Sequence, residues 1–414
     1  MNVTSLAAVA RESAPALALA STETKNRALL AIAAALRREK AGILAANALD
    51  MAAARERGMS ESLLDRLALS DARVEAMAAG AEQVAQLPDP IGEEIGHTRR
   101  PNGLEISTVR VPLGVVGMIY EARPNVTVDA AVLCLKSGNA CVLRGGKEAI
   151  RSGEALAKLM REALETVGLP GGAIGFVTDP TRESAREMMG LRGLIDVLIP
   201  RGGAGLIQTV VREARVPVIE TGVGNCHIYV DAGADVDMAA KILVNAKCSR
   251  PSVCNAAESL LVHREIARQF LPVGWALLKE QGVTLYGCER TRAILGDSVL
   301  PAGEEEYARE FLDYAMSCKV VDSLEEAVAH IARFGTGHSE AIVTEDAAAA
   351  EEFLRRVDAA AVYHNASTRF TDGGEFGLGA EIGISTQKLH ARGPMGLTAL
   401  TSTKVLVRGT GQVR

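Results

Sequence analysis

The sequence is poor in aromatic residues, has no long hydrophobic run and carries no excess of positive charge. Phe, Trp and Tyr together make up 3% of its 414 residues. No stretch reaches the ~18 consecutive apolar residues that a membrane span requires. Lys and Arg number 45 against 51 Asp and Glu, a formal net charge of -6, so no chain-wide basic field exists to attract nucleic acid or anionic lipid. We therefore expect no nucleic-acid partner and no membrane.

Disulfide and metal-binding patterns are also missing. The seven cysteines, an odd number, are scattered through the chain and never form CxxC, and the seven histidines never occur in HExxH or in paired Cys/His spacing. Because a chain of this length needs no disulfides to fold, we expect a reduced, cytoplasmic protein without a metal site. The Ala-rich stretch from Leu6 to Ala20 is interrupted by Arg11, Glu12 and Pro15, which predicts no export signal.

Sequence patterns in the first quarter of the chain predict helices followed by a hairpin. Between Lys25 and Lys40, apolar residues recur at helical spacing after a candidate cap at Ser21, and similar patterns continue to about residue 86. Polar and apolar residues then alternate around Pro101-Asn102-Gly103, which is typical of a two-stranded hairpin. We interpret this segment as a protruding β arm.

The remaining chain predicts two α/β series. In the first, β-branched runs at VVGMIY, ACVLR, AIGFV, LIDVLIP and VPVIE alternate with helical patterns, as in a parallel sheet covered on both faces. After about Thr221 come strand patterns at HIYVD, SLLVH, VTLYG, CKVVD, AIVTE and AAVYHN. Ser323 and Glu326 form a capping-box pattern that opens a helix to about Phe334. The final LTSTKVLVRG predicts a strand that pairs with the hairpin or with a neighbouring subunit. The expected fold is thus α/β, with two doubly wound domains and a β arm.

The strongest candidate site is the segment KCSRPSVCN at residues 247–255, between a predicted helix and a predicted strand. Cys254 would lie there on an irregular turn. Arg250 and Lys247 could lower the pKa of a thiol, and backbone amides of the turn could receive a developing oxyanion. The alternative is a buried, inert cysteine. Cys248 is a rival nucleophile, but it lies nearer the helical run and ranks below Cys254.

Glycine-rich turns at predicted strand ends are the second candidate. They occur at Ser137–Asn139, Arg144–Lys147 and Arg201–Gly205, and glycines there let the backbone approach a phosphate. None matches GxGxxG or a P-loop, so each is equally typical of a tight turn. Arg144 and Lys147 are more suggestive, because two cations beside a strand end can receive the 2′-phosphate of NADP. Exposed surface charge is the alternative.

Five segments, in order, resemble landmarks of the aldehyde dehydrogenase superfamily: PLGVVG, Pro124-Asn125, LKSGNACVLRGGKEA, Glu220-Thr221-Gly222 and RPSVCNA. The 34-residue interval from Glu220 to Cys254 is similar to the superfamily's spacing between its acidic residue and its nucleophile. YEARPNVTVDA, RGGKEA, RPSVCNA and HIARFGTGHSEAIVTED narrow the resemblance to the γ-glutamyl phosphate reductase family, and it runs from the first helices to the last strand.

This resemblance implies an aldehyde dehydrogenase-like subunit of three parts. Residues 1–95 and 111–220 would bind NADPH, residues 221–385 would form the catalytic domain, and residues 96–110 and 386–414 would form an oligomerisation arm. The implied reaction is NADPH-dependent reduction of L-glutamyl 5-phosphate to L-glutamate 5-semialdehyde with release of phosphate, the second step of proline biosynthesis. A homo-oligomer is implied, and a separate glutamate kinase is a candidate partner.

The resemblance also implies roles for matching residues. Cys254 would be the nucleophile that forms a thioester, and Asn125 would donate to the oxyanion together with the Cys254 amide. The implied cofactor contacts are Glu310 on the nicotinamide ribose, Arg144 and Lys147 on the adenosine ribose and its phosphate, and Gly202 and Gly203 near the pyrophosphate. For Glu310, a solvated carboxylate at a helix end is the alternative.

Glu220 and the substrate contacts stay open. In hydrolytic members the residue matching Glu220 activates water, which would waste a thioester here, so we expect it to line the site in an unassigned role. Because the implied substrate carries a carboxylate and a phosphate, cations should face the thiol. Arg250 is the candidate, with His364 and Lys388 weaker ones, and His338 either caps a turn or contacts substrate. Two other functions remain: acylation with coenzyme A, and a catalytically silent scaffold or dinucleotide-binding module.

Overall fold

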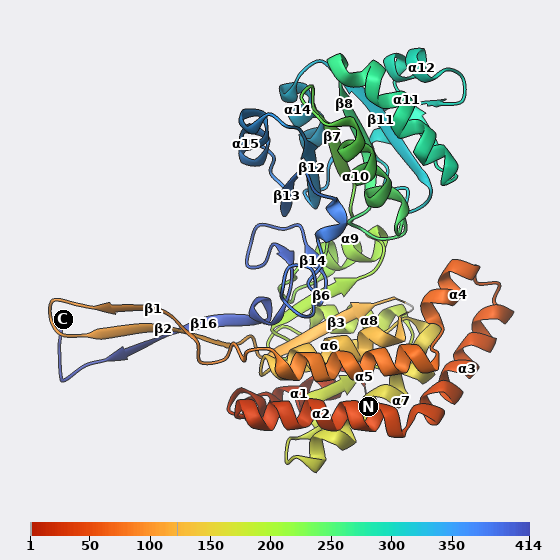
Figure 1. Cartoon of the computed structure of the whole chain (residues 1–414). Coiled ribbons are helices and arrows are strands. Elements are labelled where there is room, and N and C mark those ends of the chain that lie inside the picture. The colour runs from red at the N-terminus through yellow and green to blue at the C-terminus, as the bar shows by residue number, and fades with distance from the viewer. Residues whose placement is uncertain (1, 122) are drawn as a thin grey trace. The chain divides into compact units, whose positions relative to one another are not determined.

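The chain folds into two compact units, each with its own parallel β-sheet (Figure 1). The structure is a computed structural model that describes residues 2–121 and 123–414. Unit 1 comprises Met1–Glu220, Gly377–Gly383 and Met395–Arg414, and unit 2 comprises Thr221–Phe376 and Ile384–Pro394. Within the described ranges, no helix is long and apolar enough to cross a membrane.

Unit 1 is built on a four-stranded sheet in the order β5-β4-β3-β6, with all neighbours parallel. Its strands are β3 (Val115–Tyr120), β4 (Ala140–Arg144), β5 (Ile174–Phe176) and β6 (Val197–Arg201). The connecting helices are α6 (Pro124–Lys136), α7 (Ile150–Thr166), α8 (Arg182–Gly190) and α9 (Ala204–Glu213). Every residue of β3 is buried, because a parallel strand covered on both faces needs a continuous apolar run. The doubly wound fold expected from the sequence is confirmed.

One expected strand of unit 1 is wrong. The run VPVIE forms only a single parallel bridge, between Val218 and Leu198. Pro217 has no N–H to give to a ladder, although its carbonyl accepts from the Leu198 amide at 2.8 Å. The segment therefore lies along β6 without extending the sheet.

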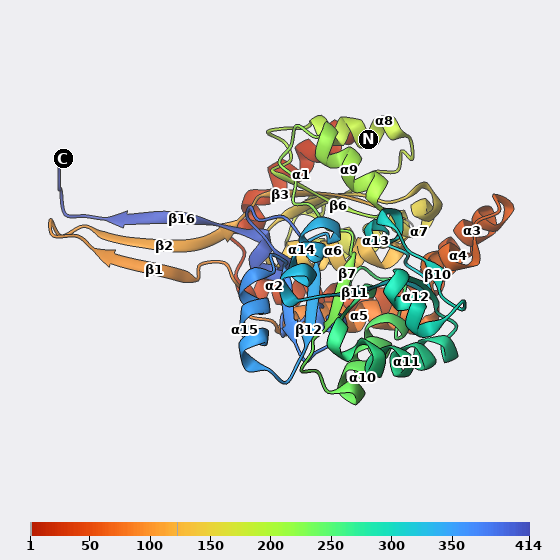
Figure 2. The same ribbon diagram turned by 90° about the horizontal axis from the view of Figure 1, so that it is seen from above.

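The hairpin and the last strand form a three-stranded antiparallel arm that extends from the rest of unit 1 (Figures 1 and 2). Its strands are β1 (Glu94–Arg99), β2 (Glu105–Pro112) and β16 (Thr401–Arg408). Gly103 takes φ 84° in the hairpin turn, a conformation that glycine adopts at little cost. β16 pairs with β2 along its whole length, from Thr401 opposite Pro112 to Arg408 opposite Glu105. The predicted hairpin is confirmed, and of the two alternatives for the final strand the structure shows pairing with the hairpin.

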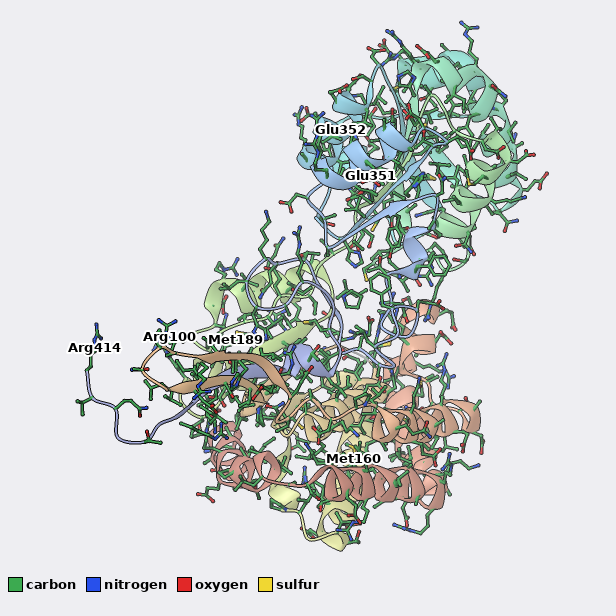
Figure 3. All side chains as sticks on the ribbon, turned by 60° about the vertical axis from the view of Figure 1, so that its left-hand side comes forward. Arg100, Met160, Met189, Glu351, Glu352 and Arg414 are labelled. Atoms are coloured by element: carbon green, nitrogen blue, oxygen red, sulfur yellow. The ribbon has the colours of Figure 1, made fainter. Side chains whose placement is uncertain are left out.

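The helices that precede the arm are α1 (Val3–Ala18), α2 (Thr22–Arg38), α3 (Lys40–Glu56), α4 (Glu61–Leu67) and α5 (Asp71–Gln86). Of these, α2, α3 and α5 pack on α6 or α7, α1 packs against β4 and β5, and α4 packs on α3. Ser21 caps α2 as expected, because its Oγ accepts from the Thr24 amide at 3.1 Å. Met160 on α7 is fully buried, whereas Arg100 at the hairpin tip is exposed (Figure 3).

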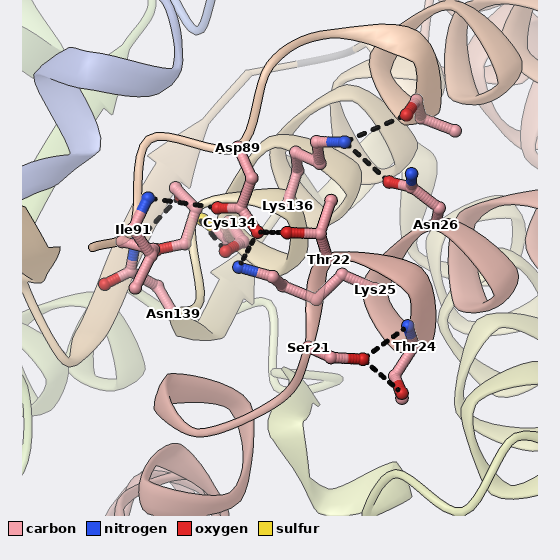
Figure 4. A network of polar contacts seen from close by, with 12 residues as sticks. Ser21, Thr22, Thr24, Lys25, Asn26, Asp89, Ile91, Cys134, Lys136 and Asn139 are labelled. Atoms are coloured by element: carbon pink, nitrogen blue, oxygen red, sulfur yellow. Dashed lines mark hydrogen bonds and ion pairs between the residues drawn. The ribbon is translucent and has the colours of Figure 1, made fainter. Parts of the chain in front are cut away.

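A buried polar network ties α2 to α6 and to the segment after α5 (Figure 4). Lys25 Nζ lies 2.5 Å from the Asp89 carboxylate. Lys136 Nζ donates to Asn26 Oδ1 at 2.5 Å and to the Ala85 carbonyl at 2.9 Å. Because buried ammonium groups need such partners, these contacts fix how the helices pack.

Unit 2 carries a seven-stranded sheet in the order β10-β9-β11-β8-β7-β12-β13, and its pairs are all parallel. Its strands are β7 (Cys226–Val230), β8 (Ala257–His263), β9 (Thr284–Gly287), β10 (Leu300–Pro301), β11 (Ala315–Val321), β12 (Ser339–Val343) and β13 (Ala361–His364). Its helices are α10 (Val236–Cys248), α11 (Arg264–Glu280), α12 (Glu289–Leu295), α13 (Glu304–Ala308), α14 (Leu324–Phe334) and α15 (Ala347–Arg356). One core lies between the sheet and α10 and α11, and another involves α14 and α15. All six strands predicted after Thr221 are present, and the two-residue β10 escaped prediction.

The predicted helix after Ser323 is confirmed as α14, with its cap altered by one residue. Ser323 Oγ accepts from the Glu326 amide at 3.3 Å. The Glu326 carboxylate accepts from the Asp322 amide at 2.7 Å, one residue before the position that a capping box uses. The remaining short elements are η1 (Lys147–Ala149), η2 (Gly171–Ala173), η3 (Thr368–Phe370), η4 (Leu397–Leu400), β14 (Ile384–Ser385) and β15 (Gly393–Pro394).

Candidate active site

Cys254 lies on an irregular turn between the end of α10 at Cys248 and the start of β8 at Ala257. Its side chain is partly exposed. The turn sits at the amino edge of the parallel sheet of unit 2, because β8 begins just after it. Cys248 is half-buried against the core under α10, and burial raises the pKa of its thiol despite the Lys247 charge. That environment makes Cys248 the poorer nucleophile.

Segments that precede four neighbouring strands meet at this amino edge. Gly224 before β7 donates its amide to Glu310 Oε1 at 2.6 Å. The next amide, of Asn225, donates to Thr336 Oγ1 at 3.0 Å, and Thr336 lies before β12. The buried Asn225 side chain donates to the carbonyls of Tyr307 and Phe334 at 2.7 and 2.8 Å. These bonds hold the irregular segments around the Cys254 turn in place.

Gly224 packs directly on the backbone of Cys254. A Cβ added at Gly224 would lie 1.4 Å from the Cys254 carbonyl oxygen and 2.8 Å from its Cα. The Cys226 thiol donates to the same carbonyl oxygen at 3.2 Å. Only glycine fits at position 224 while the Cys254 turn keeps this conformation.

A buried ion pair lies beneath the same segments. Lys247 Nζ is 2.6 Å from Glu258 Oε2, and both side chains are fully buried. Glu258 Oε1 accepts from the Leu312 amide at 3.1 Å, and burial raises the pKa of Glu258 to about 7 even with Lys247 beside it. Because Lys247 is paired with Glu258, its charge is not directed at the thiol alone.

Glu310 is held among these groups rather than at an exposed helix end. It follows α13 by two residues and is partly buried. Burial raises the pKa of its carboxyl group, while the bond from the Gly224 amide and the charge of Lys247 lower it. One carboxylate oxygen of Glu310 thus binds the amide of Gly224, the residue that packs on the Cys254 backbone.

The other polar candidates of unit 2 differ in their surroundings. Arg250 is exposed, two residues after α10. His338 is fully buried, with Nδ1 2.8 Å from Ser339 Oγ, and burial lowers its pKa to about 4, so its ring is neutral at pH 7. His364 Nε2 lies 3.0 Å from the Thr344 carbonyl oxygen, and Lys388 forms an ion pair with Asp358. His364 and Lys388, the weaker candidates for substrate contacts, therefore already bind other groups of the protein.

In unit 1, the candidate residues lie at the carboxyl edge of the sheet. β4 and β5 extend the sheet on one side of β3 and β6 on the other, so the strand order reverses between β3 and β6. Open parallel sheets bind nucleotides at such a switch point. Gly203, the second residue after β6, caps α9, and its amide donates to the carboxylate of Glu121, which follows β3, at 2.9 Å. A helix amino terminus whose amide binds a carboxylate is also suited to bind a phosphate. Gly202 and Gly203 therefore fit the pyrophosphate of a dinucleotide.

The remaining unit 1 candidates are placed as follows. Asn125, the second residue of α6, is exposed and donates from Nδ2 to Asp129 at 2.9 Å. Arg144 ends β4, and its guanidinium donates to the carbonyls of Pro180 and Thr181 at 3.1 and 2.9 Å. Lys147 is exposed at the start of η1. Glu220, the last residue of the first stretch of unit 1, is partly exposed.

The predicted residues thus fall into two groups. Cys254, Arg250 and Glu310 belong to unit 2, whereas Asn125, Arg144, Lys147, Gly202, Gly203 and Glu220 belong to unit 1. All seven cysteines carry thiols, and no group of metal-ligating side chains is found in the described ranges. Sequence reasoning missed Gly224, Glu258 and Arg369, and it included Asn255 in the candidate segment without giving it a role. The two closely spaced glycines of ETGVGNC were the only signal for Gly224, and no local pattern marks Glu258 or Arg369.

Comparisons with known proteins identify the family. The model of the aldehyde dehydrogenase family matches residues 1–280. Gamma-glutamyl phosphate reductase from Heliobacterium modesticaldum is 62% identical over 98% of this chain and 97% of its own. That from Carboxydothermus hydrogenoformans is 60% identical over 100% and 99%. The crystal structure of gamma-glutamyl phosphate reductase from Thermotoga maritima covers 100% of both chains at 50% identity, with a TM-score of 0.98.

The chain therefore belongs to the aldehyde dehydrogenase family and has the α/β fold of that family. Within it, the chain is an oxidoreductase of the gamma-glutamyl phosphate reductase family. The family resemblance and the fold class expected from the sequence are both confirmed.

Proposed function

We propose that the chain reduces L-glutamyl 5-phosphate to L-glutamate 5-semialdehyde with NADPH and releases phosphate, as the second step of proline biosynthesis. One observation carries this proposal: a partly exposed thiol, Cys254, on a turn fixed by Gly224, in a chain 62% identical to a gamma-glutamyl phosphate reductase. A thiol on a fixed turn suits covalent catalysis, because the acyl group must be held while it is reduced.

In this mechanism Cys254 carries the glutamyl group. Its thiolate attacks the carbonyl carbon of the acyl phosphate, the C–O bond to phosphate breaks, and a thioester remains. Asn125 has a second amide hydrogen besides the one given to Asp129. That hydrogen and the Cys254 amide would donate to the oxyanion of each tetrahedral intermediate. When bound, NADPH supplies the hydride that converts the thioester to the aldehyde and returns the thiolate.

The proposed NADPH contacts are those that the family resemblance implied. Gly202 and Gly203 at the start of α9 would bind the pyrophosphate, replacing the Glu121 carboxylate on the Gly203 amide. Arg144, whose guanidinium is held by the carbonyls of Pro180 and Thr181, would contact the adenosine ribose of NADPH. Lys147 would contact the 2′-phosphate. Glu310 would hold the nicotinamide ribose with the carboxylate oxygen that does not contact Gly224.

The remaining assignments concern the substrate and the assembly. Arg250 would contact a substrate anion, and Glu220 would line the site without activating water. We infer a homo-oligomer, because β1 and β16 are open edges of the arm and Val405 and Val407 on β16 are more than half exposed. A cytoplasmic location and a glutamate kinase that supplies the labile acyl phosphate complete the proposal. The proposed division of the chain has three parts. The NADPH-binding domain is formed by residues 1–95 and 111–220, the catalytic domain by residues 221–385, and the oligomerisation arm by residues 96–110 and 386–414.

The reverse reaction tests the proposal. With glutamate 5-semialdehyde, which equilibrates with its cyclic imine, and NADP, we expect formation of reduced nicotinamide, followed by absorbance, to depend on added phosphate. Turnover that needs coenzyme A instead of phosphate would assign the acylating alternative. Turnover that needs neither would reject the acyl-phosphate reaction, and dinucleotide binding without turnover would favour a silent module.

Substitution of Lys147 tests the choice between NADPH and NADH. Lys147→Glu places a negative charge where the 2′-phosphate is proposed to bind, so we expect the KM for NADPH to rise by about tenfold or more, with that for NADH nearly unchanged. Lys158→Glu makes the same charge change at an exposed position on α7 and serves as the control. Steady-state kinetics with both cofactors give the result, and an equal loss with both would remove Lys147 from the 2′-phosphate site.

A further inference from the structure

We propose that Arg369 is a substrate-binding residue whose guanidinium holds the phosphate group of the acyl phosphate beside Cys254. This inference rests on the proposed function and adds a residue that neither the sequence patterns nor the family resemblance indicated. It is carried by the contacts that Arg369 makes on both sides of the catalytic turn.

The guanidinium of Arg369 spans the Cys254 turn. Arg369 lies in η3, between Thr368 and Phe370. Its Nε donates to Ser249 Oγ at 3.2 Å, directly after α10, and its Nη1 donates to Asn255 Oδ1, directly after Cys254. One side chain thus contacts the turn before and after the nucleophile.

The segment that carries Arg369 is fixed by bonds in the opposite direction. Asn255 is buried, and its Nδ2 donates to the carbonyls of Arg369 and Thr371 at 3.2 and 3.0 Å. Thr368 Oγ1 donates to the Asn255 carbonyl at 2.7 Å. Thr371 Oγ1 lies 2.6 Å from the hydroxyl of Tyr363 and 2.6 Å from that of Ser339. A cation held in this way is preorganised for a ligand.

The charge of Arg369 has no acidic partner in contact. Among the described residues, Arg369 forms no ion pair. Its guanidinium donates to Ser249 and Asn255 on the turn, and both side chains are neutral. Burial and the nearby Arg250 lower the pKa of Arg369, whereas the charges of Cys254 and Asp372 raise it. Arg369 therefore places a positive charge near both Cys254 and Arg250 without an ion-pair partner in the part of the chain that the structure describes, an arrangement that favours an anionic ligand.

The phosphate is the substrate anion that fits this place. It is bonded to the carbon that the Cys254 sulfur attacks, whereas the α-carboxylate lies at the other end of the glutamyl chain. As the C–O bond breaks, the electron pair and negative charge pass to the phosphate oxygen. A guanidinium beside the turn stabilises that charge and can bind a phosphate through two parallel N–H bonds.

Kinetics in the reverse direction test this role. For Arg369→Gln we expect the KM for phosphate to rise by about ten- to hundredfold, with little change in the KM for glutamate 5-semialdehyde. Arg369→Lys keeps the charge and should lie between. Arg268→Gln removes a charge from an exposed position on α11 and should behave as wild type. An unchanged KM for phosphate, or a rise confined to the semialdehyde, would overturn the inference. Absence of phosphate-dependent turnover in the wild-type protein would reject the proposed function instead.

Alkylation of Cys254 provides a readout that needs no turnover and no cofactor. We compare the rates at which iodoacetate, an anion, and iodoacetamide, a neutral analogue, modify Cys254, measured by peptide mass spectrometry. Arg369→Gln should lower the ratio of the iodoacetate rate to the iodoacetamide rate severalfold, because only iodoacetate carries a charge for the guanidinium to attract. If both rates fall equally, Arg369 only supports the turn and is not an anion-binding residue.

Discussion

Replacement of Cys254 by serine is expected to abolish reduction of the acyl phosphate, with kcat falling on the order of 10³-fold or more. A serine hydroxyl ionises far less readily than a thiol, so it needs an adjacent base. His338 does not fit that task, because it is fully buried and its Nδ1 lies 2.8 Å from Ser339 Oγ. Steady-state rates of the purified variant, with circular dichroism to verify the fold, give the result.

Cys248→Ser is the matched control for this substitution. Cys248 lies at the end of α10, half-buried against the core, and we expect its variant to keep nearly wild-type turnover. Near-normal activity of Cys254→Ser would reject Cys254 as nucleophile, and an inactive but folded Cys248→Ser would transfer the role to Cys248.

Substitution of Gly224 by alanine should reduce kcat by about 100-fold without any change in a reacting group. The new Cβ would lie 1.4 Å from the Cys254 carbonyl oxygen, so the turn must move by an ångström or more. Misplacement of catalytic atoms by about 1 Å costs roughly 10²-fold in rate. Turnover, together with the rate of Cys254 alkylation by iodoacetamide, measures the displacement.

Gly233→Ala is the control for this prediction. Gly233 follows the same strand, β7, at its other end, and a Cβ there would have its nearest neighbour at 3.4 Å. We expect that variant to retain activity. If Gly224→Ala is folded and as active as Gly233→Ala, contact between Gly224 and Cys254 does not determine the position of the nucleophile.

Much of the fold could be predicted because local patterns agree with the final packing. Buried parallel strands such as VVGMIY and ACVLR are continuous apolar runs, and Ser21 and Ser323 mark helix starts by capping. The last strand itself was predicted, whereas its pairing with the hairpin rather than with a neighbouring subunit was decided only by the structure. VPVIE misled because its composition is that of a strand, although Pro217 cannot donate to a ladder.

A residue of the candidate site could be predicted only where its neighbours in the sequence indicate its role. Cys254 and Arg250 stand out in the sequence because charge and irregular spacing surround them. Gly224 and Arg369 do not, because their importance arises from contacts with segments 30 and more than 110 residues away. Such contacts are set by the order of strands in the sheet, which no local pattern specifies. The roles of the site residues, including Asn125 and Glu310, stay predictions.

Trapping of the acyl enzyme tests the central claim most directly. Glutamate 5-semialdehyde and NADP are mixed with the protein in the absence of phosphate, the reaction is quenched with acid, and peptides are examined by mass spectrometry. The account predicts a γ-glutamyl thioester on Cys254, formed together with a burst of reduced nicotinamide. The thioester should be lost when phosphate is added before the quench, and it should not form in Cys254→Ser. Wild-type turnover with the glutamyl group on another cysteine, or on none, would contradict it.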